Sequence, residues 1–466
     1  RRYNVMNEND ARVAIVIVNW NKQQEVLNLL SSLERFNYNK NDIILVDNAS
    51  SDDSVSLVRS RHPDVRLLVN SANLGGSGGF NTGLRYVLDS QRYKYVWLLD
   101  NDVEVMEGAL EALLAVAEGD DRVAIVGSKI LHSDDVSVIS EAGARISPLT
   151  SYPVPMLLNQ PDQVQNAEME VDYVAACSLL GKVEHIRKVG IMDERFFLLW
   201  DDMEWGMRFR AAGYLIIATT ASSVMHRGFT ERWITTDYRY YAARNHLYFV
   251  SRTYSGAKLV YFLLVLYMVY SIRARIYQMR KSTKPYALAI KQAMHDYRYN
   301  SMGRRETAVN SEALTVPETG FNIGEFGNVL LSTEKPMPII RKLVSNYKAK
   351  HPLMQVTLAV RSERSRLFRW HKDGIAYYDK GVFLGKHEKV DAVIRFFDEI
   401  ERPFHYEGKV LLDIDNNATI IGISHVSQAM RYGIWLRYCT AGLGGLLFGM
   451  VGALPCILTQ RSDNSQ

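Results

Sequence analysis

The sequence predicts an α/β protein with a mostly parallel central sheet. Between residues 11 and 131, short runs rich in β-branched residues alternate with helical stretches, a pattern that is typical of βαβ units. Each run is mostly apolar, as strands are when helices cover both faces of the sheet. The 466 residues are 47% apolar and 23% charged, which excludes a disordered chain and predicts roughly two or three domains.

The predicted strands are 13–18, 42–46, 65–69, 95–99 and 123–126, and we expect helices between them. The ligand of an open α/β sheet lies beyond the carboxyl ends of its strands. Polar segments follow the first four predicted strands, and they begin at Asn19, Asp47, Asn70 and Asp100. We therefore expect the chemistry of the protein at this edge of the sheet.

The segment Asp100-Asn101-Asp102 places two carboxylates two residues apart, so they point the same way if the strand continues. Mg²⁺ and Mn²⁺ are held by such oxygen ligands together with substrate phosphates. The segment therefore predicts a divalent-cation site that neutralises a nucleoside diphosphate. The alternative is an Asp/Asn turn that caps a helix over residues 104–116.

Two further segments carry weaker signals. Asp47 opens a polar segment that could hydrogen-bond a base or ribose, although the same residues would form a loop and N-cap for a helix over 54–61. Four glycines within residues 73–81 precede a predicted helix and allow close approach of the backbone to a ligand. This stretch matches neither the GxGxxG fingerprint nor the phosphate-binding P-loop.

A second block, residues 171–251, places three acidic residues at the start of a predicted helix. Asp201 and Glu204 have the spacing of a capping box. Asp202 lies in the first turn, where the helix dipole stabilises the ionised form that a general base needs. His226 follows an apolar stretch; a lone histidine is more often structural, but this one could complete a metal site.

Taken in chain order, these motifs resemble those of the glycosyltransferase family 2 enzymes with the GT-A fold, over about residues 11–250. The matching segments are 17–21, 46–50, 73–76, 100–102 and 193–202. They are most similar to the motifs of rhamnosyl- and galactofuranosyltransferases of bacterial cell-envelope polysaccharides. The resemblance implies an inverting, metal-dependent enzyme that moves rhamnose or galactofuranose from a UDP- or dTDP-sugar to a glycan or lipid-linked acceptor.

The resemblance also implies a role for each matching residue. Asp202 would be the catalytic base, and Asp100, Asp102 and His226 would hold Mg²⁺ or Mn²⁺. An alternative is a catalytically silent nucleotide-binding or scaffold protein of an assembly complex, against which the intact acids and histidine argue. The nucleotide sugar would be bound by residues at the strand ends and in the glycine-rich stretch, namely Asn19, Asp47, Asn73, Gly75, Gly76 and Asp100.

The next part of the chain differs in charge and hydropathy. Lys plus Arg total 55 against 51 Asp plus Glu, a net charge of +4 that excludes a dedicated nucleic-acid binder. Residues 271–310 hold nine basic and two acidic residues, beside the uncharged apolar stretch 259–272. These features predict an interfacial helix on an anionic membrane at the cytoplasmic face, with a core helix or a solvated linker as alternatives. A second apolar stretch, 438–460, is another candidate membrane segment.

From residue 311 onward the pattern predicts an α/β-like domain without a recognisable motif. Its expected strands are 329–332, 356–360 and 409–414, and its expected helices are 338–350 and 389–399. The expected organisation is a transferase domain over 11–250, a helical segment over 251–310, this domain over 311–440 and an apolar tail over 441–466.

The location of the protein is predicted from its cysteines and its first residues. Cys177, Cys439 and Cys456 lack the spacing of a zinc site and the density of a disulfide scaffold. Residues 1–12 lack the apolar run of a signal peptide. We therefore expect a reducing, cytoplasmic location for the bulk of the chain.

Overall fold

The computed structural model describes residues 12–305, with gaps at 37, 39–41, 134, 165, 227–234 and 279–283, and six strands between 328 and 425. The chain divides into two compact units. The first unit comprises residues 1–232, 241–263 and 296–306, and the second comprises the remainder.

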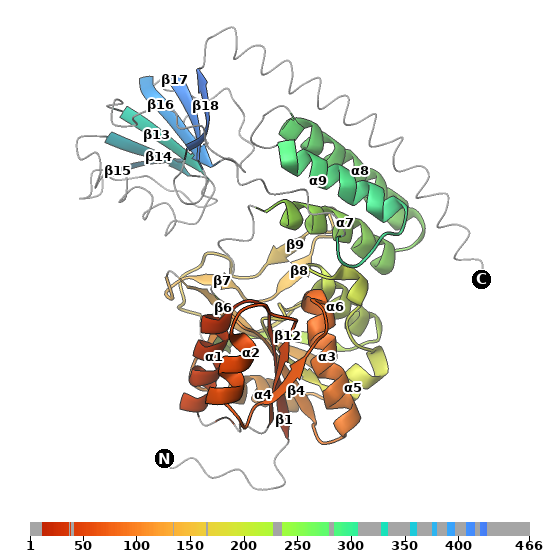
Figure 1. Cartoon of the computed structure of the whole chain (residues 1–466). Coiled ribbons are helices and arrows are strands. Elements are labelled where there is room, and N and C mark those ends of the chain that lie inside the picture. Colours follow the sequence, from red (N-terminus) through yellow and green to blue (C-terminus); the bar gives the residue numbers. More distant parts are fainter. Residues whose placement is uncertain are drawn as a thin grey trace. The chain divides into compact units, whose positions relative to one another are not determined.

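The first unit is built on a mixed sheet that contains all five predicted strands (Figure 1). They are β1 (Val13–Asn19), β2 (Ile43–Asp47), β3 (Arg66–Val69), β4 (Tyr95–Asp100) and β6 (Val123–His132). Parallel pairing joins β3, β2, β1 and β4 in that order. The predicted α/β class with a mostly parallel sheet is therefore confirmed.

Later strands complete this sheet, and one of them is inserted at its centre. β11 (Ser178–Lys182) runs antiparallel between β4 and β6, and β12 (Leu215–His226) pairs in parallel with β6. β8 (Ala144–Ile146) and β9 (Pro153–Pro155) form a separate two-stranded sheet. Three shorter strands pair with β12 or β6 and are β5 (Val103–Val105), β7 (Ile139–Glu141) and β10 (Glu168–Glu170). The sheet thus brings residues from both halves of the unit to one edge.

Helices cover both faces of the sheet, which explains why its central strands are mostly apolar. Side chains alternate along β1, so that Ile15 and Ile17 belong to one hydrophobic core, and Ala14 and Val16 to the other. The first core includes α1 (Gln23–Arg35), α2 (Ser54–Arg61) and α4 (Ala109–Gly119). The second includes α3 (Gly75–Ser90), α5 (Val183–Val189) and α6 (Asp201–Ala211).

The predicted start of the helix expected over residues 104–116 is wrong. Residues Val103–Val105 form β5, which pairs antiparallel with the end of β12, and α4 begins only at Ala109. The β-branched valines at both ends of β5 are buried in that pairing. The alternative of an Asp/Asn turn that caps this helix is therefore also wrong, because Gly108 is the N-cap residue.

Three helices follow the last strand of the first unit. α7 (Thr236–Thr253) continues through the domain boundary expected at residue 250. α8 (Gly256–Gln278) contains the predicted apolar stretch but has 23 residues, and it is the one described helix long and apolar enough to cross a membrane, with a mean hydropathy of 1.6 in its most apolar part. α9 (Lys284–Arg298) carries an apolar stripe that includes buried Ile290.

The second unit contains a six-stranded sheet of order β15-β14-β13-β16-β17-β18. Its strands are β13 (Asn328–Thr333), β14 (Gln355–Val360), β15 (Ile375–Asp379), β16 (Lys389–Phe396), β17 (Glu407–Ile414) and β18 (Ile420–His425). All neighbours are parallel except β17 and β18. The three predicted strands and the α/β-like pattern agree with this sheet.

One predicted helix of this region is wrong. Residues 389–396 of the helix expected over 389–399 form β16, which pairs in parallel with β13 and β17. Val390, Val393 and Ile394 are β-branched and favour a strand over a helix. The expected helix 338–350, the apolar stretch 438–460 and the tail 441–466 lie outside the described residues.

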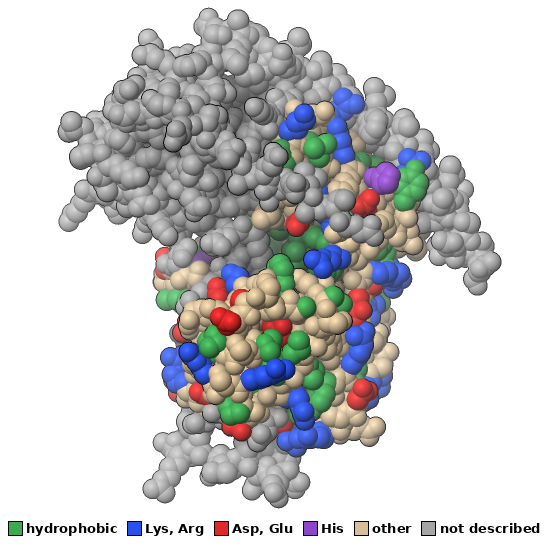
Figure 2. Space-filling model, viewed as in Figure 1, with side chains coloured by type: hydrophobic (Ala, Val, Ile, Leu, Met, Phe, Trp, Pro, Cys, Tyr) green, Lys and Arg blue, Asp and Glu red, His purple; other side chains and the backbone are tan. Residues whose placement is uncertain are grey.

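Charged side chains of both signs are interspersed on the described surface that Figure 2 draws. No large field of a single sign covers this face, which agrees with the nearly balanced composition.

Candidate active site

The pairing of β5 with β12 brings Asp100, Asp102 and His226 together. Asp100 ends β4, and β5 begins at Val103, immediately after Asp102. β5 then pairs with β12 in a register that sets Val103 opposite His226. His226 Nε2 lies 2.9 Å from Asp102 Oδ1 and 3.7 Å from Asp100 Oδ2.

These three residues fit a divalent cation. One ligand atom of each lies within 4.8 Å of the others, and they are the one such group among the described residues. Asp102 and His226 are buried, whereas the Asp100 side chain is 27% exposed, so the cluster opens at that residue. Two carboxylate oxygens and an imidazole nitrogen are a donor set suited to Mn²⁺, and the carboxylates also suit Mg²⁺.

The middle residue of the segment ties it to the two neighbouring strands. Asn101 Nδ2 donates to Asn19 Oδ1 at 2.8 Å, and Asn19 Nδ2 donates to Asp47 Oδ2 at 3.2 Å. Asp47 Oδ1 accepts the backbone N–H of Ser50 at 2.8 Å. Asn19 and Asp47 are both buried, so they hold the strand ends in place, and their contact with a nucleotide stays a prediction.

The backbone of the glycine-rich stretch packs closely against two other segments of this chain. Gly75 has a φ of 76°, and a Cβ added there would lie 2.0 Å from the carbonyl oxygen of Phe197. The Gly76 N–H donates to that same oxygen at 2.7 Å. A Cβ on Gly79 would lie 2.6 Å from Val18 in β1. These glycines therefore pack α3 against β1 and against the turn before α6, and a role in ligand binding stays a prediction.

Asn73 lies at the entrance to this stretch, and its side chain is occupied. Its Oδ1 accepts the Gly75 N–H at 2.8 Å and Asn48 Nδ2 at 3.2 Å. Asn48 also donates to the Gly75 carbonyl at 2.8 Å and accepts from the Leu74 N–H at 3.0 Å. Asn48 thus holds residues 73–75 in place through these hydrogen bonds.

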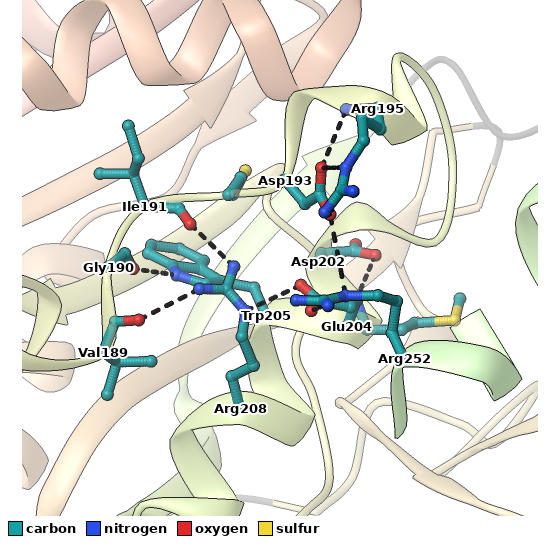
Figure 3. Close-up of polar contacts among 12 residues, drawn as sticks. Val189, Gly190, Ile191, Asp193, Arg195, Asp202, Glu204, Trp205, Arg208 and Arg252 are labelled. Carbon is teal, nitrogen blue, oxygen red and sulfur yellow. Dashed lines mark hydrogen bonds and ion pairs between the residues drawn. The ribbon is translucent and has the colours of Figure 1, made fainter. Parts of the chain in front are cut away.

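The capping box predicted for Asp201 and Glu204 is wrong. Trp200 is the N-cap, with a φ of 71° and no side-chain cap, and Asp201 is the first helical residue. Buried Glu204 instead accepts from Arg208 Nε at 2.9 Å and lies 3.8 Å from Arg252 Nε (Figure 3). Its carboxylate joins α6 to α7.

α6 is also fixed to the loop that follows α5, as Figure 3 shows. Trp205 Nε1 donates to the Gly190 carbonyl at 2.8 Å. Arg208 donates to the carbonyl oxygens of Val189 and Ile191 at 3.2 and 2.7 Å. With these bonds the helix that carries Asp202 cannot slide along the sheet without breaking buried contacts.

The segment before β11 links Asp202 to the cluster of Asp100, Asp102 and His226. The Asp100 N–H donates to the Cys177 carbonyl at 3.3 Å, and the Ala176 backbone hydrogen-bonds to Asp202. Burial raises the pKa of the Cys177 thiol, and the charges of Asp100, Asp102 and Asp202 raise it further. The predicted base and the predicted metal ligands therefore surround one point of the sheet edge.

The electrostatics of Asp202 differ from the expectation. Burial, the neighbouring Asp201 and Glu141 raise the pKa of Asp202 well above its usual range. Burial also raises the pKa of Asp201 to about 6. The helix N-terminus was expected to favour the ionised form, but the loss of hydration outweighs it here. A raised pKa brings a carboxylate closer to the value that a general base needs at neutral pH.

Glu141 is a residue of this region that the sequence did not indicate. It ends β7, is 6% exposed, and its Oε1 has no hydrogen-bond partner among the described residues. Burial raises its pKa to about 7, while the charge of His226 lowers it. Glu141 is a single acid that belongs to no recognisable sequence motif. Only the pairing of β7 with β6 places it near His226 and Asp202.

The comparisons with known proteins concern the first unit. Residues 14–179 match the family described as Glycosyl transferase family 2. A relative from Haloferax volcanii, described as "Low-salt glycan biosynthesis hexosyltransferase Agl10", is 24% identical over 198 residues, which cover 42% of this chain and 61% of the relative. The match thus spans less than two thirds of that relative's length.

Two mycobacterial relatives carry the names of the enzyme classes that the motifs resemble. The N-acetylglucosaminyl-diphospho-decaprenol L-rhamnosyltransferase of Mycobacterium tuberculosis is 24% identical over 230 residues, covering 46% of this chain and 75% of the relative. The galactofuranosyltransferase GlfT2 of the same species is 20% identical over 203 residues, covering 40% of this chain and 32% of the relative. The predicted resemblance is confirmed by these matches.

Proposed function

The chain contains a glycosyl transferase family 2 domain over residues 14–179, and on that premise we propose that it is an inverting transferase of nucleotide-diphosphate sugars. The acceptor is a glycan or lipid-linked sugar of a cell-envelope polysaccharide, and rhamnose or galactofuranose is the favoured sugar. The names of the mycobacterial relatives support this choice. The observation that carries the proposal is the convergence of Asp100, Asp102, His226 and Asp202 at one edge of the sheet.

In the proposed reaction Asp202 takes the proton of an acceptor hydroxyl. The hydroxyl oxygen then attacks the anomeric carbon of the donor, and the bond from that carbon to the diphosphate oxygen breaks with its electron pair. A single displacement of this kind inverts the anomeric centre. Mg²⁺ or Mn²⁺ bound by Asp100, Asp102 and His226 would supply charge neutralisation to the diphosphate.

The raised pKa of Asp202 fits its part in this scheme. A carboxylate with an ordinary pKa is a weak base toward a sugar hydroxyl, because little driving force favours the proton transfer. Burial and nearby negative charge increase the basicity of Asp202. Asn73, Gly75 and Gly76 flank the turn before α6, so we assign the nucleotide-sugar side of the site to that loop together with Asn19, Asp47 and Asp100.

We place the enzyme at the cytoplasmic face of a membrane. The support is α8, whose most apolar part has a mean hydropathy of 1.6, together with the basic stretch that begins at Arg273 within its last turns and continues beyond it. A lipid-linked acceptor would be reached from that position.

The direct test is a donor screen. We expect the purified chain, with Mn²⁺ or Mg²⁺ and a lipid-linked or glycan acceptor, to release nucleoside diphosphate from one sugar in a panel of UDP- and dTDP-sugars. A catalytically silent nucleotide-binding protein would bind a nucleotide and release none. That second outcome, across the full panel, would contradict the proposal.

A further inference from the structure

The turn that leads into α6 has an unusual backbone. Phe197, Leu199 and Trp200 have φ values of 63°, 66° and 71°, although none is glycine. A side chain at positive φ costs energy, and such residues persist only where the surrounding structure holds them. The next residues are Asp201 and Asp202, so the turn sets the direction in which the helix presents its acids.

Asn245 of α7 holds this turn through one amide group. Its Nδ2 donates to the carbonyl oxygens of Phe196, Leu198 and Leu199 at 2.8, 2.7 and 3.0 Å. The side chain is fully buried. The amide has two N–H groups for these three carbonyls, so at least one N–H is shared, and the segment curls around the amide.

Arg244 holds the start of the same turn. Its Nη2 donates to the carbonyls of Arg195 and Phe196 at 3.2 and 3.0 Å, and its Nη1 donates to Gly303 at 2.6 Å. The guanidinium is fully buried. The Gly303 N–H returns a bond to the Arg195 carbonyl at 2.8 Å, so the arginine and the turn form one closed network.

The remaining carbonyls of the turn are also accounted for. The Phe197 carbonyl accepts the Gly76 N–H, and the Trp200 carbonyl accepts the Glu204 N–H at 3.0 Å, the first bond of α6. Every carbonyl from residue 195 to residue 200 therefore has a donor. The ring of His246 stacks on the ring of Trp200, with centroids 4.1 Å apart, and so helps to hold Trp200 in place.

We propose that Asn245 and Arg244 are positioning residues for the catalytic base: they clamp the strained turn so that α6 presents Asp202 to the acceptor hydroxyl. The inference rests on the proposed function. Neither residue would touch the substrate, because both side chains are buried against the backbone of the turn. Their effect is on the orientation of the base, where a misplacement of about 1 Å can cost about 100-fold in rate.

We expect variants of the clamp to lower turnover without weakening metal binding. Asn245→Ala removes the shared donor and lets residues 197–200 relax toward ordinary φ values. We expect kcat for transfer to fall at least about tenfold, while the dissociation constant for Mn²⁺ changes less than about twofold, because the cation site is built from β4, β5 and β12 and not from the turn. Asn245→Ser, which keeps a smaller donor, should lose less turnover than Asn245→Ala.

Thr220→Val is the matched control. Thr220 is buried in β12 and its hydroxyl accepts the Ala167 N–H at 2.8 Å, so the variant also loses a buried hydrogen bond, away from the turn. We expect this variant to lower the thermal midpoint and leave kcat unchanged. Arg244→Lys keeps the positive charge but loses the two-pronged guanidinium geometry, so it should show the same loss of kcat as Asn245→Ala, with Mn²⁺ binding retained.

Three outcomes would overturn the inference. An Asn245→Ala protein with wild-type kcat would show that the clamp does not position the base. A parallel loss of kcat and of Mn²⁺ affinity, or a loss of kcat in Thr220→Val as large as in Asn245→Ala, would show that the clamp contributes only general stability. A wild-type protein without turnover on any donor would instead contradict the proposed function itself.

Discussion

At the scale of single residues, the candidate site concentrates acids where water is largely excluded. Asp102 and Glu141 are each 6% exposed, and burial raises the pKa of Glu141 to about 7. Burial also raises the pKa values of Asp201 and Asp202. A cluster of this kind costs stability when its acids ionise together, and a bound cation offsets that cost. We therefore expect the protein to depend on pH and on metal at identifiable residues.

Glu141 gives a pH prediction for the metal-free protein. Its pKa is raised on folding from 4.5 to about 7, so the folded state binds more protons and the free energy of unfolding falls as the pH rises through this window. Glu141→Gln removes that penalty. In the presence of EDTA we expect the variant to gain up to about 3 kcal/mol over wild type at pH 8, and little at pH 4.5.

Denaturant unfolding at a series of pH values measures this difference. A gain that is the same at pH 4.5 and pH 8 would show that the pKa of Glu141 is not raised in the folded protein.

His226 gives the corresponding metal prediction. His226→Ala removes the one nitrogen ligand of the cluster and leaves both carboxylates, so we expect the affinity for UDP in the presence of Mn²⁺ to fall at least about tenfold. Without metal the two proteins should bind UDP equally weakly. Titration calorimetry with and without Mn²⁺ makes the comparison.

His62→Ala is the control for that experiment. His62 pairs with Glu34 at 3.1 Å on the α1 and α2 side of the sheet, outside the cluster. Unchanged Mn²⁺-dependent binding by His226→Ala would remove His226 from the metal site.

At the scale of secondary-structure elements, the site depends on how closely α3 approaches the turn before α6. Gly75 allows the approach, since its Cα lies against the Phe197 carbonyl and its φ is positive. α7 holds the other side of the same turn through Asn245. The predicted base, Asp202, is thus carried by a helix whose preceding turn is held by two other helices.

Gly75→Ala tests this packing. Its Cβ would lie 2.0 Å from a backbone oxygen at a φ of 76°, so we expect the free energy of unfolding to fall by more than about 2 kcal/mol. Gly119→Ala in α4 meets no atom within 4 Å and should be neutral or stabilising by up to about 1 kcal/mol. Chemical denaturation of both variants measures the contrast, and equal stability of the two would contradict the account.

How far the sequence predicts these elements depends on the range of the contacts involved. The five early strands were predicted because their apolar runs and helical gaps are local patterns. β5 and β16 were not predicted. β5 is short and the pattern of β16 also fits a helix, so each is identified as a strand only by its pairing with distant segments. The same reason hides Glu141 and Asn245, whose contacts arise only in the folded chain. Asp100 and Asp102 were predicted as cation ligands from their spacing at a strand end, and the resemblance of the ordered motifs to a known family added His226.

At the scale of the whole molecule, the apolar α8 is followed by a basic stretch of chain. Residues 271–310 hold nine basic residues against two acidic ones, although the chain as a whole carries only +4. α8 is 23 residues long, so its length fits either an interfacial or a spanning helix. Charge distinguishes the two, because an interfacial helix relies on anionic lipid and a spanning helix does not.

We expect the full chain to sediment with anionic liposomes, and to do so less as salt rises from 0.05 to about 0.5 M. Replacing Arg273 and Arg275 by Gln should weaken the binding roughly fivefold per charge, and the same change at Arg59 and Arg61 in α2 should not. Association that resists salt and requires detergent for release would contradict the interfacial placement.

The central claim is that this chain transfers sugars with Asp202 as the base. The most direct measurement is acceptor-dependent release of nucleoside diphosphate by the wild-type protein and by Asp202→Asn, alongside UDP binding with Mn²⁺. We predict that the variant loses about 100-fold or more in kcat and binds the nucleotide within about twofold of wild type. Undiminished release by Asp202→Asn would contradict the claim.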